Sequence, residues 1–290
     1  MPELPEVETV RRGLERFVVG RRVSKVEVGR ERTVRRTSAR EVVDGLTGTR
    51  ILAANRRGKY LLLPLDSGDE MMIHLRMSGQ VLVVDVGTQR PPHTHVVLHL
   101  DPPERRGLCQ TQTTPKELWF VDPRTFGEVV VFDPANVAAE VPELALLGID
   151  PITDGLSLRQ LRSLLRRRHR LLKPLLLDQH AIAGIGNIYA DEILHAARLR
   201  PDRLSDDLSL DAERRLHTSM HSVLTAAINA GGSTLRDAQY VDLFGAGGEY
   251  QEAHRVYGRT GERCITCGVG WIRHTVSAQR STHFCPRCQR

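Results

Sequence analysis

The chain opens with the stretch MPELPEVE, residues 1–8, and apolar residues at helical spacing follow it. Removal of Met1, which the small neighbour Pro2 permits, would leave a secondary amine at the start of the chain. An α-amino group has a pKa about two to three units below that of lysine, so it becomes a neutral nucleophile more readily. Its attack on a sugar carbon would give an iminium, with Glu3 and Glu6 close by. The structural alternative is that Pro and Glu simply suit the first turn of a helix.

The first half of the chain predicts one helix and then a series of strands. Apolar side chains at Val7, Val10, Leu14 and Phe17 indicate an amphipathic helix that Gly20 ends. Short strand-like runs, separated by turn residues, predict an antiparallel sandwich or barrel. The expected strands are Val23–Val28, Arg50–Asn55, Tyr60–Leu65, Met71–Leu75, Gln80–Asp85, His95–Leu100, Glu117–Val121 and Glu128–Phe132.

The second half changes to helical periodicity. Ser157 is a plausible N-cap for a helix, and Leu171–Leu177, Ile188–Leu199 and Asp211–Ala230 are three further helices. Residues 101–116 are expected to form a surface loop, which would hold Cys109 as an unpaired thiol. The fold class is therefore a multidomain α+β protein.

The charge distribution favours a polyanionic partner. Lys and Arg outnumber Asp and Glu by 41 to 35, and the basic residues cluster in residues 11–40 and 157–173. Clustered arginines suit phosphate binding, although a solvated charged face is the alternative. No signal peptide and no membrane-spanning apolar run is seen, so we expect a cytoplasmic protein.

Four of the five cysteines form two Cys-x-x-Cys pairs, Cys264/Cys267 and Cys285/Cys288, with seventeen residues between the pairs. This spacing suits a tetrahedral zinc ion, and redox chemistry is the less favoured alternative. Four protein ligands leave no open position, so we predict one structural Zn²⁺ per chain that stabilises a short finger.

A glycine-rich turn, Gly184-Ile185-Gly186-Asn187, stands directly before a predicted helix. Backbone N–H groups at such a helix start can hold a phosphate. Asn187 could cap that helix or contact a phosphate itself, and capping is the commoner role.

These motifs, in this order, resemble the bacterial formamidopyrimidine-DNA glycosylases, of the family shared with endonuclease VIII. The likeness covers essentially the whole chain, and Leu4 in the opening stretch points to the formamidopyrimidine branch. The motifs that carry it are MPELPEVE at 1–8, KPLLLD at 173–178, GIGNIYADE at 184–192 and VYGR at 256–259, followed by the cysteine pairs. The resemblance implies an N-terminal helix with an antiparallel β-sandwich, a helical domain with a helix-two-turn-helix motif, and a C-terminal zinc-finger β-hairpin.

The resemblance also implies roles for individual residues. Pro2 would be the nucleophile, Glu3 the general acid/base at the sugar ring oxygen, and Glu6 the holder of the active-site hydrogen-bond network. Lys59 would contact phosphate and aid base release. The side chains implied to contact DNA are His74, Met77, Arg124, Phe126, Lys173, Asn187 and Arg280, of which Met77, Arg124 and Phe126 would enter the duplex where the damaged base leaves. Arg76 is a weaker match, because many members have Gly there.

The chain departs from the family pattern at three places. The span between the cysteine pairs is one residue longer than usual, so we expect a bulge in the outward strand before Arg280. Thr125 stands where a second arginine is common. The loop Tyr240–Tyr250 matches the segment that closes over the extruded base, where members vary most.

We therefore expect five segments: a catalytic β-sandwich domain (1–133), a linker (134–150), a helical DNA-binding domain (151–235), a lesion-capping loop and connector (236–262), and a zinc finger (263–290). The expected activity is that of a bifunctional DNA glycosylase/AP lyase for 8-oxoguanine and formamidopyrimidines, acting as a monomer on double-stranded DNA at the nucleoid. The alternatives are an endonuclease VIII-like enzyme for oxidised pyrimidines and a non-catalytic binder of damaged DNA.

Overall fold

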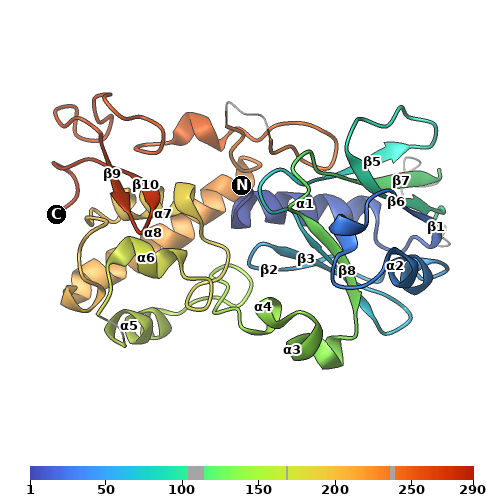
Figure 1. The fold of residues 1–290 in the computed structure, drawn as a ribbon. Coiled ribbons are helices and arrows are strands. Elements are labelled where there is room, and N and C mark those ends of the chain that lie inside the picture. The colour runs from blue at the N-terminus through green and yellow to red at the C-terminus, as the bar shows by residue number, and fades with distance from the viewer. Residues whose placement is uncertain (104–113, 168, 236–238) are drawn as a thin grey trace. The chain divides into compact units, whose positions relative to one another are not determined.

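The structure is a computed structural model that describes residues 1–103, 114–167, 169–235 and 239–290 (Figure 1). Cys109 and most of the predicted loop around it lie outside these residues. Contacts between residues divide the chain into two compact units. The first comprises Met1–Leu146 and Gly231–Gly248, and the second comprises Leu147–Ala230 and Glu249–Arg290.

The predicted amphipathic helix is α1, Leu4–Phe17. Glu3 is its N-cap residue and forms a reciprocal capping box with Glu6, which satisfies backbone donors that a helix start leaves open. Val7, Val10 and Leu14 on one face of α1 are fully buried in the core of the first unit.

Two four-stranded antiparallel sheets form the rest of that core, which confirms the predicted sandwich. One sheet has the order β1-β6-β7-β5 and the other the order β2-β3-β4-β8. Their strands are β1 Val23–Val28, β2 Asn55–Arg57, β3 Tyr60–Pro64, β4 Glu70–His74, β5 Gln80–Asp85, β6 Thr94–Leu100, β7 Lys116–Val121 and β8 Glu128–Phe132. Strand β5 alternates between buried and partly exposed positions, whereas β4, β6, β7 and β8 are buried along most of their length.

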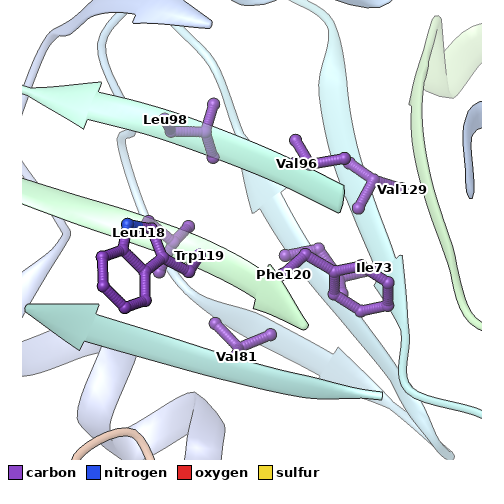
Figure 2. Close-up of a pocket in the computed structure, with 8 residues that line it drawn as sticks. All are labelled: Ile73, Val81, Val96, Leu98, Leu118, Trp119, Phe120 and Val129. Carbon is purple, nitrogen blue, oxygen red and sulfur yellow. The ribbon is translucent and has the colours of Figure 1, made fainter. Parts of the chain in front are cut away.

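Side chains from both sheets meet around a small void (Figure 2). Phe120, Leu98 and Leu118 come from one sheet, and Ile73 and Val129 come from the other. The void has a volume of about 10 Å³ and an apolar lining, which is at the lower limit for a single water molecule. It is thus a packing defect of the core and offers no room for a ligand.

One predicted strand of this unit was wrong in detail, and one helix was not predicted. The expected strand Arg50–Asn55 makes only isolated bridges at Arg50 and Ile51, and regular pairing begins at Asn55. A helix that was not predicted, α2, spans Ala39–Leu46 and starts with a capping box between Ser38 and Glu41. The segment expected to be a linker contains two short helices, α3 (Val137–Glu140) and α4 (Pro142–Ala145).

The second unit holds the predicted helices. They are α5 Leu158–Arg166, α6 Leu172–Leu177, α7 Asn187–Ala196 and α8 Leu210–Asn229. Ser157 caps α5 as expected, through its hydroxyl and the N–H of Gln160. Buried faces of α7 and α8 pack together in the core of the unit. No described helix combines the length and the apolar character needed to cross a membrane.

The chain ends in a hairpin of β9 (Arg273–Ser277) and β10 (Arg280–Phe284). Pairing runs from Ser277 opposite Arg280 to Arg273 opposite Phe284 without a register shift, so the predicted bulge before Arg280 is wrong. The hairpin closes through Ala278 and Gln279, which both have positive φ, as a tight two-residue turn requires.

Candidate active site, metal centre and nucleic-acid contacts

The first candidate site lies at the start of α1. Pro2 is buried, whereas Met1 is exposed. Glu3 and Glu6 are almost completely buried. One carboxylate oxygen of Glu6, Oε2, accepts the N–H of Glu3 at 2.8 Å. The backbone that carries Pro2 is therefore fixed by the helix it precedes.

The other carboxylate oxygen of Glu6 fixes a segment that is distant in the sequence. Its Oε1 accepts the N–H of Ser233 at 2.7 Å. Gly232 has φ +80°, and a Cβ there would meet Oε1 of Glu6 at 2.7 Å, so only glycine fits this approach. Burial, followed by the charge of Glu6, raises the pKa of Tyr240, whose hydroxyl donates to the carbonyl of Gly231. Glu6 is thus the centre of a buried network, and Ser233 and Tyr240 are members that the sequence did not reveal.

The segment that carries Tyr240 is folded against α1. Leu243 is buried, contacts the position of Gly13, and its carbonyl accepts the N–H of Val83 at 3.0 Å. The ring of Phe244 meets that of Phe17 edge-on at 4.8 Å. Residues 236–238 of the expected lesion-capping loop lie outside the described residues.

Lys59 and His74 belong to the same sheet, Lys59 in a turn and His74 at the end of a strand. Gly58 and Lys59 form the turn between β2 and β3, and Gly58 has the positive φ that such a turn needs. His74 ends β4 and is buried against the edge of Tyr60, at 4.3 Å between ring centroids. Burial, and then the charges of Arg76 and Lys59, hold the pKa of His74 well below its ordinary value. Because Nδ1 accepts the N–H of Arg76 at 2.9 Å, the neutral ring carries its proton on Nε2 as a donor.

Two loops carry the three side chains expected to enter DNA, and one buried carboxylate joins them. Met77 lies between β4 and β5, and Arg124 and Phe126 lie between β7 and β8. Asp122 accepts the Ser78 hydroxyl at 2.5 Å from the first loop. From its own loop it accepts the N–H groups of Arg124 at 3.1 Å and Gly127 at 2.7 Å.

The side chains on these loops remain available to solvent. Met77 and Phe126 are 39% and 40% exposed, and both border one pocket. The guanidinium of Arg124 lies over the ring of Phe126, 5.0 Å from its centroid. Thr125 takes a positive φ of 54°, so the loop is held in a conformation that few side chains adopt.

The two loops border an open pocket of about 620 Å³ that Met1 also lines, together with Arg32, Arg35, Arg76, Met77 and Phe126. The chain start and the two apolar side chains therefore share one basic pocket. Glu128, which is fully buried, lies behind it and pairs with Arg76 at 3.0 Å, Arg36 at 3.0 Å and Arg35 at 3.4 Å. Its single charge orients three arginines without neutralising them. The pairing could not be read from the sequence, because Glu128 lies 52 positions from Arg76 and 92 from Arg36.

The four predicted zinc cysteines, Cys264, Cys267, Cys285 and Cys288, are brought together in the second unit, with all Sγ atoms within 4.8 Å of one another. Two Sγ–Sγ distances are 3.7 and 3.8 Å, and a tetrahedron with zinc–sulfur bonds of about 2.3 Å has edges of about 3.8 Å. The donor set therefore fits Zn²⁺. Gly270 donates to Cys267 Sγ at 3.3 Å, and a Cβ at Gly270 would clash with Cys285 Sγ at 2.7 Å.

Acidic residues of α7 hold the finger in place. Glu192 is buried and accepts three backbone N–H groups, from Arg255, Val256 and Tyr257, at 2.8 to 2.9 Å. Asp191 accepts the N–H of His283 on β10 at 2.8 Å. The acidic pair at the end of the motif GIGNIYADE is thus structural, a role that the sequence analysis did not identify.

The prediction that Lys173 contacts DNA needs correction. Its side chain is 0% exposed, and Nζ lies 2.6 Å from Asp191 Oδ1, 2.6 Å from the Ser281 carbonyl oxygen and 2.9 Å from Thr282 Oγ1. An ammonium group held by these partners has no surface to offer a phosphate. Lys173 instead ties α6 to α7 and to β10.

Asn187 and Arg280 each lie at the start of an element, Asn187 in α7 and Arg280 in β10. Asn187 is partly exposed and Arg280 is exposed. Asn187 is the first residue of α7 and Gly186 is the N-cap, so Asn187 does not take the first of the two roles considered for it, that of the N-cap. Arg280 is exposed at the start of β10, next to the hairpin turn.

Most arginines of the two basic clusters have structural partners. Arg11 and Arg12 pair with Glu8, and Arg21 is buried on backbone carbonyls, including that of Phe17 at 2.7 Å. Arg162 pairs with the buried Glu213 at 2.6 Å. Many described arginines of the two clusters therefore make structural contacts, and Arg32 and Arg35 of the first cluster line the pocket beside Met1.

A sandwich that carries exposed apolar side chains beside the chain start, with a helical unit that ends in a four-cysteine hairpin, defines the class of zinc-finger DNA glycosylases. The model of the formamidopyrimidine-DNA glycosylase N-terminal domain matches residues 1–129, and that of the formamidopyrimidine-DNA glycosylase H2TH domain matches residues 147–239. The chain belongs to the formamidopyrimidine-DNA glycosylase family.

Individual relatives match over the full chain. The chain is 42% identical to the formamidopyrimidine-DNA glycosylase of Heliobacterium modesticaldum and 41% identical to that of a Roseiflexus species, with complete coverage of both proteins in each case. Among solved structures it resembles the Lactococcus lactis Fpg in complex with DNA that contains an abasic site, with a TM-score of 0.85, 33% identity and 99% of each chain covered. It also resembles the Lactococcus lactis enzyme with DNA that contains Fapy-dG, with a TM-score of 0.85, 33% identity, and coverage of 99% of this chain and 100% of that one.

Proposed function

We propose that the chain, a base excision repair glycosylase by its family, is a bifunctional DNA glycosylase/AP lyase for oxidised purines. Its substrates would be 8-oxoguanine opposite cytosine and formamidopyrimidines in double-stranded DNA. The observation that carries this proposal is the pocket lined by Met1, Met77 and Phe126, because it joins a candidate nucleophile to candidate wedges.

The nucleophile would be the amine of Pro2 after removal of Met1. Since Met1 lines the pocket and Pro2 follows it, the freed nitrogen would lie at the pocket wall. The amine attacks C1′ as the bond to the damaged base breaks, and cleavage of the C1′–O4′ bond, with a proton delivered to O4′, then gives an open-chain Pro2–C1′ iminium. Loss of a C2′ proton then drives β-elimination, and a second elimination releases the remaining phosphate and leaves a one-nucleotide gap.

The residues around Pro2 would divide the work. Glu3, buried beside it, would move a proton at the sugar ring oxygen. Glu6 uses both carboxylate oxygens on backbone N–H groups, so it would hold the site rather than exchange protons. Lys59 and the Nε2–H of a neutral His74 would bind phosphate oxygens near the lesion.

Removal of a base from the stack leaves a gap that must be filled. Met77 and Phe126 have the exposure and apolar character of wedges that stabilise a kinked duplex. Arg124, stacked on Phe126, would hydrogen-bond the cytosine that lost its partner. Asn187 and Arg280 would hold backbone phosphates, with the zinc finger as the support of Arg280. We place this enzyme in the cytoplasm, as a monomer at the nucleoid through DNA.

Excision from three duplexes, carrying 8-oxoguanine opposite cytosine, an oxidised pyrimidine or no lesion, tests the substrate class. We expect cleavage of the 8-oxoguanine duplex to be the fastest, with product ends that carry phosphates on both sides of the gap. Faster cleavage of the oxidised pyrimidine would assign the chain to an endonuclease VIII-like preference. Binding without cleavage of any lesion, by protein that lacks Met1, would make it a non-catalytic binder and overturn the proposal.

A further inference from the structure

The second unit contains another basic pocket, which the proposed chemistry does not use. Its volume is about 550 Å³, and five arginines line it together with two of the zinc cysteines. The arginines are Arg198, Arg203, Arg215, Arg287 and Arg290. No Asp or Glu side chain is among the described residues that line it.

The arginines come from segments that are separated in the sequence. Arg198 follows the C-cap residue of α7, Ala197, and has φ +59°. Its carbonyl accepts the N–H of Arg290 at 3.2 Å. Arg215 lies on α8, and Arg287 stands between the last two cysteines. The fold thus gathers five guanidinium groups that the sequence leaves dispersed.

Few of their hydrogen-bond donors are used within the protein. Arg215 Nε donates to the Ala197 carbonyl at 3.1 Å, and Arg203 donates to two carbonyls, at 3.1 and 3.3 Å. Each guanidinium has five N–H donors. The side chains of Arg198 and Arg287 are exposed, and neither has a partner among the described residues.

Neutralisation of the zinc centre does not account for the whole cluster. A zinc ion held by four thiolates carries a net negative charge, and neighbouring arginines would stabilise it. Five guanidinium groups exceed that charge. The pocket keeps a positive excess and open donors, which is the chemistry of an anion site.

We propose that this pocket binds the phosphodiester backbone of a second nucleic-acid segment, separate from the segment that carries the lesion. Planar guanidinium forks bind phosphate oxygens in pairs. The described lining offers no aliphatic or aromatic side chain that would anchor an acidic peptide. Asn187, the candidate phosphate contact on the same helix, lies at the other end of α7, which spans ten residues or roughly 15 Å.

The consequence is that one molecule would hold two DNA segments. A second, sequence-independent contact keeps a protein near DNA while it exchanges between neighbouring sites. The contact does not require glycosylase activity, so the test of this second binding site is independent of the test of the proposed function.

Native mass spectrometry of the zinc-loaded full chain with excess short lesion-free duplex tests the proposal. We expect complexes with two duplexes per chain at low salt, and about tenfold weaker binding of the second duplex in the variant Arg198→Ala/Arg287→Ala. The matched control Arg40→Ala/Arg214→Ala also removes two exposed charges, but outside the pocket, and should keep the second duplex. If the double variant loses zinc, Arg198→Ala alone, whose position is remote from the cysteines in sequence, should still weaken the second duplex about threefold.

Competition identifies the ligand class. Sodium tripolyphosphate should displace the second duplex from the wild-type chain before it displaces the first. If tripolyphosphate binds the pocket far more tightly than DNA does, the ligand of the pocket is a free polyphosphate and not a DNA backbone. Better displacement by an oligoglutamate of equal charge would overturn the proposal in favour of an acidic protein partner. A wild-type chain that never binds a second duplex, or a variant that still binds it normally, would also overturn it.

Discussion

Replacement of Asp122 by asparagine should separate base excision from the rest of the chemistry. The Asp122 carboxylate accepts three hydrogen bonds, from Ser78, Arg124 and Gly127, and has no exposed surface. An amide keeps one acceptor oxygen and places an NH₂ group where the second acceptor stood. At least one buried backbone N–H then faces another donor, which costs about 1–3 kcal/mol.

That cost falls on the two loops that carry Met77, Arg124 and Phe126, so the loop conformation that enters the duplex becomes less populated. We expect kcat/KM on an 8-oxoguanine duplex to fall about tenfold to a hundredfold. Strand cleavage at an abasic site in single-stranded DNA should change little, because an unpaired strand leaves no gap to fill. Single-turnover kinetics on both substrates measure the split.

The control is Asp133→Asn, since Asp133 also caps a turn through Ala135 and Asn136 but lies at the surface away from these loops. The control should cleave both substrates at the wild-type rate. If Asp122→Asn excises 8-oxoguanine normally, or slows both substrates equally, the carboxylate does not position the wedges and the reasoning is refuted.

Three further predictions concern the second unit. Arg280→Ala should weaken binding to all lesions and reduce the slope of log affinity against log salt by about 0.9, as loss of one phosphate contact requires; an unchanged slope in anisotropy titrations would remove Arg280 from the interface. Cys285→Ser should lower the zinc content from one per chain to none and unfold the finger, while the sandwich stays folded. Metal analysis that still finds one zinc per chain would disprove the four-cysteine site. Burial lowers the pKa of His254 to about 4, below its ordinary 6.5. Between pH 6.5 and pH 4 the unfolded chain therefore binds a proton at His254 that the folded chain does not bind. Stability should therefore fall as the pH drops from 6.5 through 4, by up to about 1.4 kcal/mol per pH unit, and His254→Phe should flatten that loss in urea titrations, whereas an identical pH profile would count against it.

Local patterns predicted most of the fold because they are local in origin. The alternation in β5 reflects one buried face of that strand, and the bounds of β1, β5 and β8 match the predicted ones. The helix α2 was missed although its capping box, Ser38 to Glu41, is visible in the sequence. Most of the strand expected over residues 50–55 is absent, because a short apolar run does not show whether a partner strand lies beside it.

Contacts between distant residues account for what the sequence could not show. Glu128 and Arg36 are ninety-two positions apart, and Glu6 and Ser233 are separated by 227. Lys173 illustrates the limit most clearly, because a basic residue in a basic run suggested a phosphate contact, yet its partner Asp191 on α7 makes it part of the core. Charge type was readable from the sequence, but burial and pairing were not.

The central claim is that the amine of Pro2 performs the chemistry, and borohydride trapping followed by peptide mass spectrometry tests it most directly. Protein without Met1, mixed with an 8-oxoguanine:cytosine duplex and borohydride, should give a covalent adduct that maps to Pro2, because reduction fixes the iminium. Protein whose start is blocked by an N-terminal extension should give none. An adduct that maps to Lys59 or another lysine, or the absence of any adduct from fully processed protein that cleaves the lesion, would contradict the claim.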